Sequence, residues 1–162
     1  RKGMLILMCA KNNQIFHDIL NAYEDLEKPN FHFVMKSYNS LKYQSILHDI
    51  YSLFKITDNT DLNDDFCISI QFEHYNKPSF LYLSLVSTYA FLYYENKVIN
   101  SIDTMYHEFS DLINILFSYD FILLNKNELL YEFDIDTSSF NVENQKASVL
   151  ALLFSFGLSI NE

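Results

Sequence analysis

The sequence predicts a single α+β domain in which helices and strands occupy separate segments of the chain. Apolar residues recur at helical spacing in the first third, alternate with polar residues in the middle, and return to helical spacing in the last third. The chain has 162 residues, of which 49% are hydrophobic and 20% charged, as expected for one folded domain. We therefore expect one domain over residues 1–162, with N-terminal helices (1–57), a small antiparallel meander (66–98) and C-terminal helices packed on it (100–157).

Two helices are predicted in the first segment. One spans residues 12–28, where apolar side chains follow helical spacing until Pro29 interrupts the pattern. The other begins near Ser40 and carries an apolar stripe from Tyr43 to Phe54. Residues 31–35 fit either a strand or a helical turn, and the sequence leaves this choice open.

The middle segment predicts strands. Residues 57–65 (TDNTDLNDD) are polar, acidic and rich in turn formers, which indicates a linker. Phe66, Ile68, Ile70 and Phe72 alternate with smaller or more polar residues, a pattern typical of a strand with one buried face and one wetter face. Residues 80–86 and 89–94 form two further apolar runs separated by turn residues, so we expect an antiparallel meander.

The last third predicts one long helix and several short elements. Asn100 or Ser101 caps a helix whose apolar stripe continues to Phe117, and this helix should pack across the sheet. Residues 121–124 fit a short strand.

A capping box then marks a short helix, because Asn125 is followed three residues later by Glu128. A final helix is predicted over residues 142–156 and should end at Gly157 in the left-handed conformation.

The composition excludes several classes of protein. Two glycines and two prolines are too few for a Walker loop, a dinucleotide fingerprint or a nucleophile elbow. A net charge of −10 with a single arginine, Arg1, disfavours nucleic acid and anionic membrane surfaces as partners. Cys9 and Cys67 form no CxxC motif, so we expect free thiols, a cytoplasmic protein, and neither a metal nor a cofactor.

One alternative assigns chemistry to two His-Asp dipeptides. His17-Asp18 and His48-Asp49 lie on predicted helices, and this pattern is similar to that of the HD phosphohydrolase family. The resemblance implies a metal site in which His17, His48, Asp49 and Asp111 hold a divalent cation over a phosphate ester. The other interpretation is that both histidines are polar residues beside the buried helix stripes, and we assign no catalytic residue.

The acidic charge is concentrated in one part of the chain. Residues 1–57 carry a net charge of +2 and residues 58–162 carry −12, so the acidic part suits a basic protein partner, although it could also serve solubility alone. Exposed tyrosines would supply apolar anchors beside the carboxylates, although the two candidates, Tyr75 and Tyr94, fit packing in the sheet equally well. The candidate partner-binding residues are Asp61, Asp64, Asp65, Glu128, Glu132, Asp134 and Asp136, with Tyr75 and Tyr94 as the anchors.

Three stretches also carry a resemblance to a family. FLYLSLVSTYAFLYYENK (80–97), ILFSYDFILLNKNELLYEF (115–133) and ASVLALLFSFGLSINE (147–162) together resemble bacterial immunity proteins of polymorphic and contact-dependent growth inhibition toxin systems. The resemblance implies a stoichiometric inhibitor that covers the active site of a cognate toxin. A basic toxin, such as a nuclease that must hold phosphate, would match the acidic surface. A structural or host-interaction module is the third interpretation, and the sequence leaves the oligomeric state open.

Overall fold

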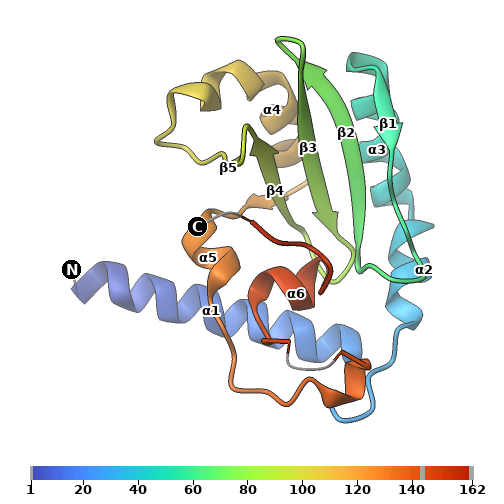
Figure 1. The fold of residues 1–162 in the computed structure, drawn as a ribbon, viewed down its shortest axis with the longest axis vertical. Helices are drawn as coiled ribbons and strands as arrows, with labels where there is room; N and C mark the ends of the chain where they lie inside the picture. Colours follow the sequence, from blue (N-terminus) through green and yellow to red (C-terminus); the bar gives the residue numbers. More distant parts are fainter. Residues whose placement is uncertain (1, 143–144, 161–162) are drawn as a thin grey trace.

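The computed structural model describes residues 2–142 and 145–160, which form a single α+β domain as predicted (Figure 1). The helices, including two short 3₁₀ helices, are α1 (Lys2–Tyr23), α2 (His32–Tyr38), α3 (Leu41–Leu53), η1 (Thr104–Phe109), α4 (Ser110–Ser118), α5 (Lys126–Leu130), η2 (Ser138–Phe140) and α6 (Val149–Leu153). The strands are β1 (Ile56–Asp58), β2 (Cys67–His74), β3 (Lys77–Ser84), β4 (Tyr89–Tyr94), β5 (Lys97–Val98) and β6 (Ile122–Leu123). Within the part of the chain described, no helix is long and apolar enough to cross a membrane.

The sheet contains the predicted antiparallel meander. Its strands follow the order β1-β2-β3-β4-β5, and every neighbouring pair on this path is antiparallel. Strand β6 pairs in parallel with the start of β4, while β5 pairs with its end, so these two short strands share the outer edge of β4. The linker predicted over residues 57–65 is wrong at its beginning, because Ile56–Asp58 is an edge strand that pairs with β2.

Both faces of β2 are buried over its first half. Phe72 packs toward α3 and the start of α4, with its ring centroid 5.1 Å from that of Phe54 and 6.2 Å from that of Phe109. On the opposite face the sequence predicted wetter side chains, yet Cys67 is 0% exposed and Ser69 is 8% exposed. The physical reason is that α1 and α6 cover this end of the sheet, so only the far half of that face resembles the prediction.

The N-terminal helices differ from the prediction at their ends. Helix α1 begins at Lys2 and ends at Tyr23, five residues earlier than expected, because Glu24 adopts a left-handed conformation with φ of 68°. The open choice at residues 31–35 resolves to helix, since most of them lie in α2. Helix α3 begins after Ser40 as predicted, and the Ser40 side chain accepts a hydrogen bond from the Tyr43 backbone N–H.

The C-terminal elements are shorter than predicted. The helix expected from residue 100 to Phe117 divides into η1 and α4, while the capping box of α5 is present as expected. The final helix predicted over 142–156 is wrong for most of its length, because α6 spans only Val149–Leu153; residues 143 and 144 lie outside the described residues. The predicted left-handed cap at Gly157 is also wrong, because the helix ends at Phe154 and Gly157 has no positive φ. The Phe154 carbonyl accepts a hydrogen bond from the backbone N–H of Phe66, and this contact holds the chain away from a further helical turn.

Candidate binding groove

A groove with a volume of about 520 Å³ opens between α2, the turn before β2 and the segment after α6. Its size falls in the range typical of ligand pockets. The groove is defined by Phe31, Val34, Met35, Leu62, Asn63, Asp64, Asp65, Phe66, Phe140, Asn141, Val142, Ser155, Phe156 and Gly157. It therefore collects side chains from four stretches that are distant in the sequence.

The groove has an aromatic floor. Phe31 stacks nearly parallel on Phe66, with ring centroids 5.8 Å apart and planes 4° apart, and Phe140 and Phe156 pack around them. Phe66 is buried, but Phe31 remains 43% exposed. Met35, one helical turn beyond Phe31, is 51% exposed. Large apolar side chains that stay exposed beside a cavity indicate a surface that a partner can cover.

Three carboxylates line or border this groove. One turn of chain brings Asp61 and Asp65 together, because the Asp65 backbone N–H donates to the Asp61 carbonyl at 2.9 Å, and Asp64 is exposed between them. Asp65 is half-buried, and its Oδ1 accepts a hydrogen bond from Ser155 Oγ at 2.5 Å. None of the three carboxylates is in a salt bridge within residues 2–142 and 145–160. We call Asp61, Asp64 and Asp65 the acidic rim.

The environment of Asp65 opposes its charge. Burial raises the pKa of its carboxyl above the ordinary aspartate value, the Ser155 hydrogen bond lowers it, and the neighbouring Asp61 and Asp64 charges raise it again. The net result of these three effects is a raised pKa for the Asp65 carboxyl. A cation placed in the groove would relieve this unfavourable environment, and a perturbed carboxyl group in a cleft is typical of a functional position.

The second acidic group predicted from the sequence does not line the groove. Three of its members already have structural partners: Glu128 caps α5 and pairs with Lys11, Glu132 pairs with Lys146 at 3.4 Å, and Asp136 accepts from the Ser138 backbone N–H at 3.0 Å. That last bond lowers the pKa of Asp136. Asp134 is exposed.

The two predicted tyrosine anchors differ from each other. Tyr75 is 67% exposed at the β2–β3 turn, and its hydroxyl donates to Glu108 at 2.7 Å. Tyr94 is only 4% exposed, so it packs in the sheet, the second of the two interpretations, and is not an exposed anchor. Its register on β4 directs it toward the helices, where its ring packs 5.5 Å from that of Phe109. Neither tyrosine lines the groove.

The His-Asp dipeptides have a shared structural role. Asp18 accepts a hydrogen bond from Tyr89 and Asp49 accepts one from Tyr119, so each carboxylate ties its helix to a distant part of the chain. His17 and His48 are both exposed. Among the residues that the structure describes, no group of three or more His, Cys, Asp or Glu side chains is placed to hold a metal ion.

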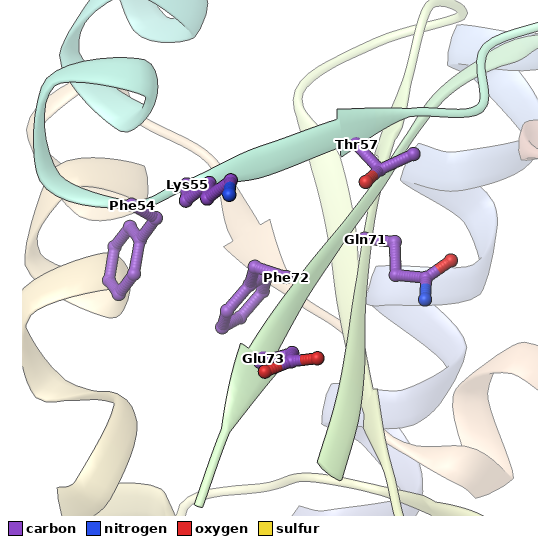
Figure 2. Close-up of a pocket in the computed structure, with 6 residues that line it drawn as sticks. All are labelled: Phe54, Lys55, Thr57, Gln71, Phe72 and Glu73. Atoms are coloured by element: carbon purple, nitrogen blue, oxygen red, sulfur yellow. The ribbon is translucent and has the colours of Figure 1, made fainter. Parts of the chain in front are cut away.

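A smaller hollow of about 290 Å³ lies at the start of β1. Figure 2 shows that Phe54 and Phe72 lie on one side of the β1–β2 pair, whereas Thr57 and Gln71 lie on the other. Lys55 and Glu73 both line it, so it has no single sign of charge. The strand edge divides this hollow, and its described lining has one carboxylate and no exposed large apolar side chain, unlike the lining of the groove beside α2.

Sequence analysis found the acidic rim but missed the aromatic floor. Phe31, Met35, Phe140 and Phe156 gave no signal because isolated apolar residues are expected in a core. The one available indication was the ambiguous apolar stretch after Pro29. Protein-family models, curated proteins and solved structures were all compared with the chain, and none of them matches it. No residue role is therefore carried over from another protein.

Proposed function

We propose that this domain is a non-catalytic binding protein that neutralises a cognate bacterial toxin by stoichiometric binding, as the immunity proteins that its sequence resembles do. The observation that carries the proposal is the groove beside α2, where exposed apolar side chains lie next to an acidic rim that has no basic partner in the described part of the chain. Such a protein would act in the cytoplasm of the cell that makes it.

Charge complementarity favours a basic partner. The chain carries a net charge of −10, and the acidic rim gathers three of its carboxylates at one groove. Complementary fields raise association rates by orders of magnitude at low salt. A nuclease toxin binds phosphate with basic side chains, so an acidic protein surface would compete directly for that site.

The apolar part of the groove supports slow dissociation. Binding energy at interfaces is concentrated in a few side chains that become fully desolvated. Phe31 and Met35 have about half of their surface available for such burial. The rim would thus set the rate of capture, and the floor would set the lifetime of the complex.

The nucleophiles near the groove favour binding over catalysis. The Ser155 hydroxyl donates a hydrogen bond to Asp65, but Ser155 is only 3% exposed, so a substrate would not reach this hydroxyl. Cys67 is fully buried, and burial raises the pKa of its thiol to about 12, which suppresses the reactive thiolate.

The test is a titration against the product of the gene immediately upstream. If that product is a toxin, its activity should fall linearly with added protein and reach zero near a 1:1 ratio. Absence of binding to the upstream product would contradict the proposal. So would phosphatase activity that requires manganese or magnesium and is lost in His48→Ala, since this result would favour the hydrolase alternative.

A further inference from the structure

We infer that the groove beside α2 is a recognition site for an arginine side chain, presented with a neighbouring apolar residue by one segment of the protein partner. The guanidinium would stack on Phe31 and donate hydrogen bonds to Asp65 and Asp64. This inference rests on the proposed function in that the segment belongs to the neutralised protein, but the site can be tested without that protein.

The floor provides a stacking surface. Phe66 stacks parallel to the Phe31 ring, and Phe31 is still 43% exposed where it lines the groove. A planar guanidinium stacks on an aromatic face, whereas an ammonium group is compact and strongly hydrated. The flexible thioether of Met35 lies one turn away and can pack against the aliphatic part of an incoming side chain.

The rim provides acceptors for the donors of a guanidinium. Ser155 occupies Oδ1 of Asp65, and Oδ2 of Asp65 has no hydrogen-bond partner in the described part of the chain. A carboxylate can accept about four hydrogen bonds, and a guanidinium offers five donors in a fork that fits carboxylates. Asp64 is exposed beside Asp65 and provides a second carboxylate.

The charge around the groove selects a cation. Its described lining contains two carboxylates and no lysine, arginine or histidine, and Asp61 adds a third negative charge at the rim. Burial and these neighbours raise the pKa of Asp65, so an arriving cation would stabilise the ionised form. The half-buried position makes this interaction stronger than one between fully exposed charges.

The size of the groove calls for more than one side chain. A cavity of about 520 Å³ is comparable to pockets that hold whole small molecules. Within the aromatic floor, the rings of Phe140 and Phe156 pack with centroids 5.3 Å apart and add apolar surface beside Phe31. We therefore assign this surface to an apolar residue next to the arginine.

The experiment uses the full chain and the probe acetyl-leucyl-arginyl-leucinamide, titrated in ¹H–¹⁵N correlation spectra. We expect saturable shifts of the backbone amides of Phe31, Asp65 and Phe66. The matched probe with citrulline in place of arginine keeps the shape and loses the charge, and it should bind about tenfold more weakly. The lysine probe should also bind more weakly, because it cannot stack.

Three variants localise the effect. Asp65→Asn should weaken the arginine probe about tenfold, because it removes a charge-assisted hydrogen bond. Phe31→Leu keeps an apolar side chain but removes the stacking face, and should weaken the probe severalfold. Asp134→Asn, an exposed carboxylate outside the groove, is the control and should leave the affinity unchanged.

Several results would overturn the inference. These are a Kd weaker than about 10 mM for the arginine probe, equal affinity for the citrulline or lysine probe, or shifts that map away from the groove. If the toxin binds the protein but the probe fails, the inference is wrong and the proposed function stands. If the probe binds in the groove and the upstream product does not, the proposed function is wrong and the arginine site stands.

Discussion

The hydroxyl of Tyr89 donates a hydrogen bond to Oδ2 of Asp18 at 2.5 Å and thereby joins β4 to α1 across 71 residues. Tyr119 donates in the same way to Asp49, which joins the end of α4 to α3 across 70 residues. Burial and the neighbouring carboxylate raise the pKa of Tyr89, so its hydroxyl remains protonated and able to donate. The two similar His-Asp dipeptides thus share a structural role that their sequence resemblance to metal ligands did not suggest.

The Tyr89–Asp18 bond should contribute measurably to stability. Tyr89→Phe removes the donor and leaves a partly buried carboxylate without it, so we expect a loss of about 1.5 to 3 kcal/mol in the free energy of unfolding. Urea denaturation measures this loss. His17→Ala, which changes the exposed neighbour, is the control and should change stability by less than about 0.5 kcal/mol. Equal stability of Tyr89→Phe and the unmodified protein would mean that the bond contributes nothing.

The segment from η1 into α4 should be a major part of the core. Phe109 and Leu112 are 3% and 1% exposed, and Phe109 packs against Phe72 on the sheet. Phe109→Ala or Leu112→Ala should therefore cost about 2 to 5 kcal/mol. Phe117→Ala in α4 is the matched control, since Phe117 is 49% exposed and its truncation should cost much less stability. Denaturant midpoints that fall equally in all three variants would contradict this account.

Elements with a local cause could be predicted from the sequence. Helix α3 begins where Ser40 can cap it, and α5 begins where Asn125 and Glu128 exchange hydrogen bonds. A few neighbouring residues therefore determine where each of these helices begins. Strand β1 has only three residues, too few to show an alternating pattern, and it exists because the edge of β2 lies beside it. Helix α6 is short because the Phe154 carbonyl accepts a hydrogen bond from Phe66, a distant residue just before β2.

The groove also shows that local sequence patterns do not report contacts between distant segments. The acidic rim was visible because carboxylates cluster within five residues of sequence. The floor depends on Phe31 meeting Phe66 and Phe156, and no local pattern reports contacts over such separations. The sequence left Tyr94 open between an exposed anchor and sheet packing for a related reason: the register of β4 decides which face each side chain takes, and a shift of one residue reverses it.

Asp65 should destabilise the fold when it is ionised. Its pKa is raised in the folded state, so its contribution to stability is present at low pH and is lost as the pH rises through that raised value. Asp65→Asn keeps an acceptor for Ser155 and removes the charge, so the variant should be more stable than the unmodified protein at pH 7. This gain should shrink as the pH falls through the raised pKa and be mostly gone below about pH 4, where the carboxyl is largely protonated in both states.

Urea denaturation of Asp65→Asn at pH 7 and near pH 3.5 measures the effect. The exposed Asp134→Asn is the control and should change stability by less than about 0.5 kcal/mol in each measurement. A destabilised Asp65→Asn at pH 7 would contradict the raised pKa. A stabilised variant that binds its partner poorly would fit a residue retained for binding at a cost in stability.

The acidic rim should control how fast the partner binds. Replacing Asp61, Asp64 and Asp65 with asparagine removes three charges while the amide of residue 61 can still accept from the Asn63 backbone N–H, as the Asp61 carboxylate does at 3.0 Å. We expect the association rate with the upstream gene product to fall about tenfold at low salt and to lose most of its salt dependence. The dissociation rate should change less, because Phe31 and Met35 remain in place.

The matched control replaces Glu132, Asp134 and Asp136 with their amides. This variant loses the same amount of charge from outside the groove, so it should retain more of the association rate and of the salt dependence. Stopped-flow or surface-binding kinetics at several salt concentrations measure both variants. If the two triple variants slow association equally, general charge rather than the groove steers the partner. If neither variant changes the rates or the salt dependence, the acidic surface serves solubility alone.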